Sequence, residues 1–328
     1  MNALASIFFR REAGILVMIV LFCLIVGLYK PQFLTLSSLR IVLLLTPLIL
    51  IGAMAQMLVL IARHIDLSIG SMLGFSAMVV GLMYREFPDI WWIVGFPVAI
   101  LTGATLGLFN GLLVTIFKLP SIIVTLGTLS LYRGLTFIIS DARQINRSVI
   151  PTELKAMSRT SPVFDIPWII LLAFGIAVVT YILVRHTQLG RQIYALGSNP
   201  RAAPLRGISV NKVTLIVFAL AGALSGLAGI LYASRWGFVN PSNTGAGFEF
   251  QVIAAVIIGG VSINGGVGTV LGAVLGVLLL GCVAAALPLL GIPGSTQNAI
   301  QGAVILIALL IDRSVRQRGL ASMSKGAA

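Results

Sequence analysis

The feature that most constrains this chain is a succession of long apolar segments running from near its beginning to near its end. A membrane-spanning helix needs about 20 mostly apolar residues, because its backbone polar groups must be hydrogen-bonded without water. The segments predict an all-α, polytopic membrane helix bundle of about ten transmembrane helices, forming one domain over residues 1–328. The ten segments are 13–29, 39–62, 67–84, 91–117, 120–139, 166–184, 213–233, 249–263, 267–287 and 294–312.

The scarcity of charge supports this interpretation. Only 9% of the residues are charged and 58% are apolar, whereas about 25% of the residues of a soluble domain are charged. So few charges cannot cover a surface that faces water, and the solvent of this chain is therefore largely lipid. Cys23 and Cys282 lie inside apolar segments without metal or redox spacing, so the sequence predicts no metal site.

The distribution of basic residues predicts the orientation. With ten spans and the N-terminus inside, thirteen Lys and Arg residues fall in inside segments and eight in outside segments. Because cytoplasmic loops accumulate Lys and Arg, this split predicts an inner-membrane protein with both termini in the cytoplasm. Loop 140–165 would then lie outside and loop 185–212 inside. The same rule explains the net charge of +13 without nucleic-acid binding.

The segment 249–263 is too short to cross the membrane as a straight helix. It contains two glycines at 259–260, and two more follow it at 265–266. It predicts a half-helix or a tight hairpin with the next span. Irregular backbone at membrane depth persists only where protein or a cavity covers it. This region is therefore a candidate for a functional role.

Two glycine motifs predict close helix packing. Three glycines spaced four apart occur in the fourth segment and again in the ninth, which places each set on one helix face. Close backbone approach is how membrane helices associate, so we favour packing over solute contact. The five-span separation also suggests an inverted five-plus-five repeat. The glycines are Gly103, Gly107 and Gly111 in one motif and Gly268, Gly272 and Gly276 in the other.

The sequence contains no catalytic arrangement. There is no HExxH, no GxSxG and no GxxxxGK[ST] motif, so no catalytic residue and no bound ATP are predicted for this chain. Carboxylates are missing from the middle of the spans, which disfavours proton coupling. Sodium sites built from backbone carbonyls remain compatible with the sequence. Neutral polar residues such as Asn110, Thr125 and Thr128 are candidates for a polyol pathway or, equally, for helix–helix hydrogen bonds.

Several segments resemble the permease subunits of bacterial monosaccharide ABC importers. Residues 65–71, IDLSIGS, resemble the IDLSVGS signature of that family. Further similarity lies in NGLLV at 110–114 with KLPSIIVTLGTLSLYRGL at 118–135, in GRQIYALGSNPRAAPLRGI at 190–208, and in GGVS with GGVGT at 259–269. The segments follow the family's order and cover most of the chain between residues 60 and 312.

The resemblance implies a transport subunit rather than an enzyme, with no cofactor of its own. In such importers two identical or homologous permeases pair, a separate ATPase subunit uses ATP inside, and a periplasmic binding protein delivers the solute. Solutes of the family include ribose, arabinose, rhamnose and autoinducer-2. The main alternative is a stand-alone secondary sugar carrier; a scaffold or an intramembrane enzyme is more remote because no catalytic constellation exists.

The inside loop contains a candidate coupling helix for the ATPase at 198–208. Asn199 or Ser198 would cap the helix, Pro200 would take its first position, and Gly207 would end it. The small residues Ala202 and Ala203 would form a slim face that fits a groove of the ATPase. Arg201 and Arg206 would be the flanking charges.

The outside loop is a candidate docking surface for the binding protein. It carries Arg143 and Arg147 among mixed charges, and Pro151 can open a short helix. For both this loop and the inside loop, a solvated linker is the alternative.

Overall fold

The computed structural model describes residues 11–161, 166–293, 296, 299 and 302–303, and within them the regular elements are all helices. Nine of the ten predicted segments coincide with a helix. Most of the tenth, 294–312, lies outside the described residues. The nine helices are α2 (Arg11–Tyr29), α3 (Leu36–Ile61), α4 (Ile69–Glu86), α5 (Gly95–Ile116), α6 (Ser121–Ile139), α8 (Trp168–His186), α10 (Val210–Trp236), α11 (Phe248–Ile258) and α12 (Val270–Leu289).

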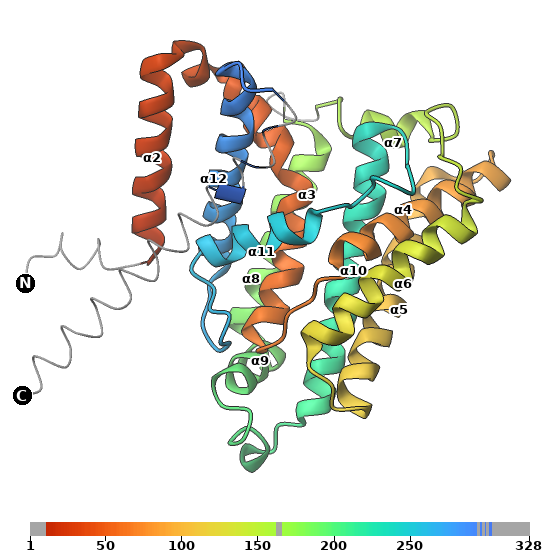
Figure 1. Cartoon of the computed structure of the whole chain (residues 1–328), viewed down its shortest axis with the longest axis vertical. Coiled ribbons are helices and arrows are strands. Elements are labelled where there is room, and N and C mark those ends of the chain that lie inside the picture. The colour runs from red at the N-terminus through yellow and green to blue at the C-terminus, as the bar shows by residue number, and fades with distance from the viewer. Residues whose placement is uncertain (1–10, 162–165, 294–295, 297–298, 300–301, 304–328) are drawn as a thin grey trace, which may run out of the picture.

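Shorter elements connect these helices. Between the long helices lie the α-helices α7 (Thr152–Ala156) and α9 (Gln188–Ser198), and the 3₁₀ turns η1 (Pro31–Leu34), η2 (Trp92–Val94) and η3 (Pro204–Arg206). The helix α7 follows Pro151, as the sequence predicts. In Figure 1, α7 lies at one end of the bundle and α9 at the other. We call these the α7 end and the α9 end.

Among the described helices, seven are long and apolar enough to cross a membrane. The other two of the nine are α4 and α11. The helix α4 has 18 residues but contains glycines and serines and ends in Arg85 and Glu86. The helix α11 has only 11 residues, which agrees with the prediction that segment 249–263 begins as a half-helix.

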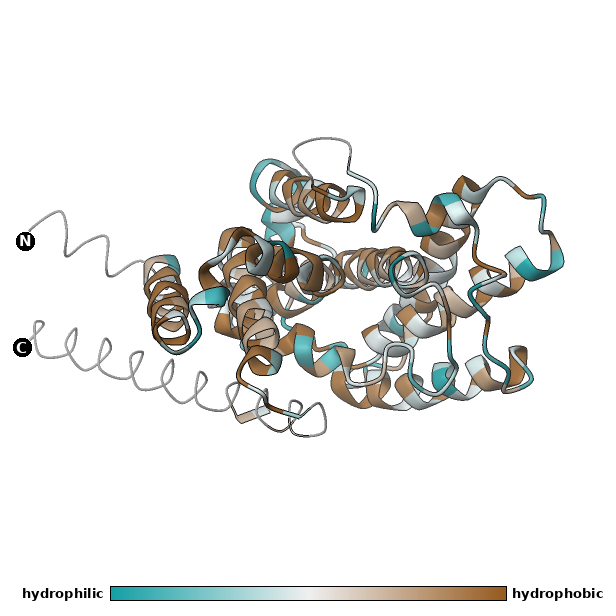
Figure 2. Ribbon diagram, turned by 90° about the horizontal axis from the view of Figure 1, so that it is seen from above, coloured by the Kyte–Doolittle hydropathy of each residue, from teal (hydrophilic) through white to brown (hydrophobic). Residues whose placement is uncertain are grey.

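The three most enclosed spans are α3, α10 and α12, with 67%, 67% and 72% of their apolar window buried. By contrast, α2 is 17% buried and packs on α12 along one side. Hydrophobic residues cover most of the helices in the view of Figure 2. Large exposed apolar side chains such as Leu21 and Ile25 of α2, each more than half exposed, are therefore placed to face lipid.

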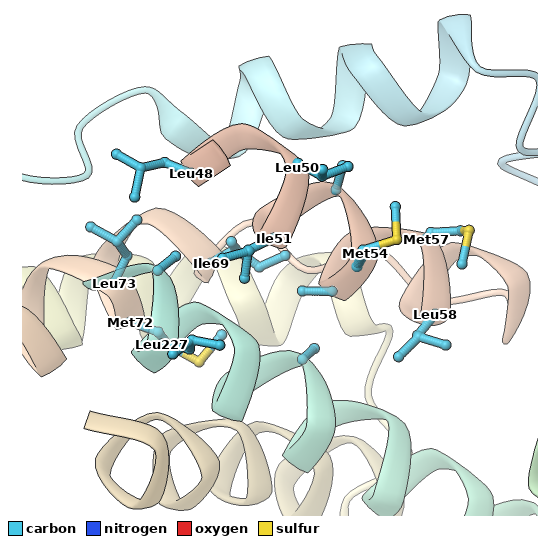
Figure 3. Close-up of a cluster of buried hydrophobic side chains, with 14 of the residues drawn as sticks. Leu48, Leu50, Ile51, Met54, Met57, Leu58, Ile69, Met72, Leu73 and Leu227 are labelled. Carbon is cyan, nitrogen blue, oxygen red and sulfur yellow. The ribbon is translucent and has the colours of Figure 1, made fainter. Parts of the chain in front are cut away.

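The centre of the core lies where α3, α4 and α10 meet (Figure 3). Ile51 and Met54 of α3, Met72 of α4 and Leu227 of α10 point into it. Gly229 brings α10 against the backbone of α4, because a Cβ there would meet the carbonyl oxygen of Leu73 at 2.5 Å. Small residues thus allow the backbones to approach where lipid gives no hydrophobic drive for association.

The first glycine motif packs as predicted. A Cβ at Gly103 would overlap the carbonyl oxygen of Gly222 in α10, and one at Gly107 would overlap the carbonyl oxygen of Phe218. Gly226 of α10 approaches Ala99 of α5 equally closely. At these glycines α5 and α10 therefore lie backbone to backbone, which agrees with the packing interpretation.

The second motif departs from the prediction at its first residue. The helix α12 begins at Val270, because the Thr269 hydroxyl caps it by accepting a hydrogen bond from the Gly272 amide at 3.0 Å. Gly268 therefore lies outside the helix, where an added Cβ would meet the side chain of Val261. Gly272 and Gly276 do pack within the bundle, against the backbone of α11.

The pattern of contacts agrees with an inverted repeat in which α3, α4 and α5 correspond to α10, α11 and α12. The pairs α3–α12 and α10–α5 are both in contact, as are α3–α11 with α10–α4 and α4–α5 with α11–α12. The outer helices α2 and α8 depart from this symmetry. α2 packs on α12, so the repeat would place α8 on α5, but α8 packs on α3.

Candidate functional site

The first break in the bundle is the segment 62–68 between α3 and α4, which holds the IDLSIGS motif. Its backbone is hydrogen-bonded by side chains of α6. The Ser121 hydroxyl accepts from the Ile65 amide at 3.0 Å. The Thr125 hydroxyl accepts from the Leu67 amide at 3.1 Å and donates to the Ile65 carbonyl at 3.2 Å. Thr125 therefore replaces the hydrogen bonds that a helix would otherwise supply.

Buried polar side chains continue from this break into α5 and α6. The Asp66 carboxylate accepts from the Ser68 hydroxyl at 2.6 Å, and Ser68 accepts from the Asn110 amide at 2.8 Å. The Tyr132 hydroxyl lies 2.8 Å from the Asn110 carbonyl oxygen, to which it can donate. Thr128 is also buried and bonds to its own helix. The hydrogen bonds of Asn110 and Thr125 therefore join different parts of the bundle, whereas that of Thr128 stays within α6. None of the three lines a described cavity.

The second break is the segment 237–247 between α10 and α11. Arg133 of α6 donates to the Thr244 carbonyl at 2.6 Å, and the Thr244 hydroxyl accepts from the Asn240 amide at 3.0 Å. Gly70, at the start of α4, packs against Gly245 and the Glu249 carboxylate. The two breaks therefore meet, and both α4 and α11 begin inside the bundle (Figure 1).

The α9 end carries the predicted coupling segment, and part of the prediction holds. The Asn199 side chain accepts from the Arg201 and Ala202 amides, both at 3.1 Å, as a cap does. Gly207 closes the segment in the left-handed conformation, at φ 73°. Arg201, Arg206 and Ser198 are exposed, and Pro200 is half-buried.

Two features of the prediction are wrong. Residues 198–208 are not one helix, because α9 ends at Ser198 and only the 3₁₀ turn Pro204–Arg206 follows. Ala203 does not face outward, since it is 3% exposed and belongs to the chain's own core, while Ala202 is half-buried. The outward residue is Leu205, which is 87% exposed. The sequence analysis missed Leu205, although an apolar residue between Pro204 and Arg206 in a polar loop was a usable signal.

The segment is firmly attached to the bundle. The Tyr194 hydroxyl of α9 donates to the Gly268 carbonyl at 2.7 Å. Gly197 packs against the backbone of Ile61, the last residue of α3, and against that of Gly266. The Gly266 amide in turn donates to the Ile61 carbonyl at 2.9 Å. Three connections that lie far apart in the sequence thus form one body at the α9 end.

The α7 end carries the predicted docking residues. Arg143 and Arg147 are exposed, and Lys155 donates to the Arg147 carbonyl at 2.8 Å. Ile145 pairs with Val239, so this loop is bound to the second break. The same loop, between Ser148 and Lys155, lines a cavity of about 600 Å³ together with α4 and the connection to α5. Glu153 and Lys155 belong to the mixed charges of the predicted docking loop, whereas the structure adds Arg85, Asp89, Trp91 and Trp92.

Comparison with known protein families identifies the family of this chain. Residues 38–309 match the family described as branched-chain amino acid transport system / permease component. The chain belongs to this permease family. The matched region contains both breaks, the Leu205 loop and the docking loop, so the whole candidate site lies within it. No solved structure matches the chain.

Curated relatives of this permease are similar over nearly all of it. The autoinducer 2 import system permease protein LsrC of Photorhabdus laumondii is 35% identical, over 94% of this chain and 90% of its own. The LsrC protein of Yersinia pseudotuberculosis is 34% identical over 94% and 86%. That of Escherichia coli is 36% identical over 94% and 88%. The resemblance to importer permeases is confirmed.

Proposed function

We propose that this permease is the membrane-spanning pore subunit of an ATP-binding-cassette importer for a small sugar-like solute. A periplasmic binding protein delivers the solute, a separate ATPase subunit binds ATP, and two permeases form the pore. The family and the naming of the relatives as autoinducer 2 import permeases support the class. The single observation that carries the coupling to a partner is the exposed Leu205 on a rigid loop.

Leu205 supports a partner because of how it is presented. Almost all of its side chain is exposed, with Arg201 and Arg206 on either side. Behind it, Ala203 is packed into the core and Asn199 caps the turn. An apolar tip on a preorganised loop is suited to insertion into a groove, because little conformational entropy is lost on binding.

The packing of the Leu205 loop against the bundle provides a path by which movement of the ATPase reaches the two breaks. A displacement of the tip is transmitted to α9, and from there to the end of α3 and the connection 259–269, because these pack as one body. The first break begins directly after the end of α3, and the second break is joined to the connection 259–269 through α11. Closure of the ATPase dimer would thereby rearrange the breaks and alternate access between the two sides of the inner membrane.

The α7 end supports delivery from the periplasm. Its cavity of about 600 Å³ holds two tryptophans with charges of both signs, and exposed Arg143 and Arg147 stand nearby in the same loop. Aromatic residues supply contact area, and rim charges steer an approaching protein. In this proposal the α9 end faces the cytoplasm and both termini lie inside, in agreement with the charge asymmetry of the sequence.

The test is Leu205→Asp in the full complex. We expect loss of ATPase co-purification and of uptake, while the permease still inserts and purifies, because Leu205 has no packing role in the chain itself. Ser209→Asp is the matched control, since Ser209 is exposed in the same loop and its side chain makes no cap hydrogen bond. Normal ATPase attachment in Leu205→Asp would overturn the coupling role. Uptake by vesicles containing the permease alone would favour a secondary carrier.

A further inference from the structure

A second cavity, of about 560 Å³, lies among α3, α10, α11 and α12. It extends from the α7 ends of α10 and α12 to the first turn of α11, which lies about half-way along the bundle (Figure 1). Its wall is mostly apolar, with residues such as Leu45, Leu48 and Leu280. Five of its side chains are polar or aromatic with a polar group; they are Tyr232, Arg235, Trp236, Asn243 and Gln251.

One charged side chain lines this cavity among the described residues, Arg235. Its guanidinium donates to the Leu44 carbonyl and lies 5.4 Å from the centre of the Trp236 ring. A guanidinium has five N–H donors, so Arg235 keeps donors for an oxygen atom of a solute. No carboxylate lines the described wall, so an ammonium group would find no partner there.

Two side-chain amides are available as well. Within the described part of the chain, the side chains of Asn243 and Gln251 make no hydrogen bond. Each amide offers two donors and an acceptor with two lone pairs. Gln251 lies in the first turn of α11, at the inner end of the cavity, and Asn243 lies in the second break. Hydroxyl groups, which both donate and accept, satisfy such amides without any charge.

The aromatic side chains complete the wall. Tyr232 and Trp236 are one turn apart on α10, with ring centres 6.2 Å apart. Ligand sites of this kind are cavities of about 300–1,000 Å³ with apolar and aromatic walls and a few polar groups. Transporter sites form between repeats at broken helices, and this cavity joins α3 of the first half to the second break.

We propose that this cavity binds the solute inside the permease, and that the solute is a small, polyhydroxylated molecule without a cationic group. The inference rests on the proposed import function and adds a place and the contacting residues to it. A phospholipid fits less well, because its acyl chain would lie against the unpaired Gln251 amide at the inner end. An amino acid fits less well, because its ammonium group would have no carboxylate among the described lining residues.

The experiment uses the complete transporter in proteoliposomes, with radiolabelled autoinducer-2, ribose and leucine as probes. Gln251→Leu and Asn243→Leu remove the amides at nearly constant volume, and we expect at least a tenfold increase in KM for uptake of the polyol probe. Ala284→Phe fills the cavity from α12 and should abolish uptake. ATPase co-purification should stay normal in all three. Gly175→Phe is the control, because a Cβ at Gly175 meets nothing within 4 Å.

The outcomes separate the site from the function. In one outcome, the unmodified transporter imports autoinducer-2 or ribose while both amide variants keep the same KM and Ala284→Phe still takes up solute. That result would overturn the site and leave the proposed importer function in place. Import of leucine, with no import of autoinducer-2 or ribose, would overturn the assignment of a polyhydroxylated solute. A co-purified phospholipid that Ala284→Phe displaces without loss of uptake identifies a lipid site instead. No uptake of any probe by the unmodified complex overturns the proposed function, and the site with it.

Discussion

The two breaks occupy corresponding places in the two halves of the bundle, yet they are built differently. At the first break, Thr125 and Ser121 bond to the backbone and Asn110 extends a buried network, so the segment is sealed. At the second break, Arg133 donates to the Thr244 carbonyl and Val239 pairs with Ile145, but Asn243 lines a cavity. The comparison teaches that a repeated plan can seal one copy with side chains of neighbouring helices and leave the other beside an open cavity.

The largest expected effect tests the seal of the first break. Thr125→Val preserves shape but leaves the Leu67 amide and the Ile65 carbonyl unpaired. Because each buried unpaired group costs about 1–3 kcal/mol, we expect the permease to lose about 3 kcal/mol of stability. Thermal unfolding of the purified protein measures it. Thr115→Val is the control, since Thr115 bonds only to its own helix. Equal melting temperatures for the two variants would contradict the anchoring role.

A smaller effect is expected at the second break. Arg133→Leu removes the bond to the Thr244 carbonyl, and a hydrogen bond to a charged group contributes about 1.5–3 kcal/mol. We expect amide exchange to increase in residues 240–248 and to stay unchanged in residues 62–68. Hydrogen exchange with mass spectrometry distinguishes the two segments. Equal increases in both would show that the breaks are one cooperative unit, which removes the contrast.

Gln251 lines the cavity beside the second break, and its replacement should affect transport without affecting stability. Gln251→Leu should change the stability of the permease by less than about 0.5 kcal/mol, because its amide has no partner to lose and its position is half-buried. Thermal unfolding measured beside Thr125→Val checks this. A loss as large as that of Thr125→Val would assign Gln251 to the fold.

The smallest effect is expected in the loop that carries Arg143 and Arg147 and pairs with the second break through Ile145 and Val239. Reversing both charges, with Arg143→Glu and Arg147→Glu, should slow uptake about two- to fivefold at low salt and little at high salt, because exposed charges act mainly on encounter. Uptake with a titrated binding protein checks this. The control is Arg40→Glu, since Arg40 is exposed on another element. Uptake that is independent of salt in both variants would exclude the loop from docking.

Sequence reasoning found the parts of the fold that depend on local hydropathy. It located nine helices, the short α11 among them, because apolar segments and the glycines that end them are visible in the chain. It could not decide whether Asn110 and Thr125 line a path or bond helices, because that depends on what lies opposite them in space. Ala203 was assigned to the wrong side for the same reason, since a small residue is equally suited to a partner's groove and to the chain's own core.

The polarity of α4 and the shortness of α11 have a consequence for how the protein enters the membrane. After its first two residues, α2 is apolar from Ala13 to Tyr29 and needs no partner to be stable in lipid, so it can insert as soon as it is synthesised. α4 ends in Arg85 and Glu86 and falls short of the hydropathy of a lone span, and α11 is too short to cross alone. Each is followed at once by a strongly hydrophobic span, α5 or α12, against which it packs. Biogenesis should therefore proceed by hairpins, with α4–α5 and α11–α12 each leaving the translocation machinery as a pair.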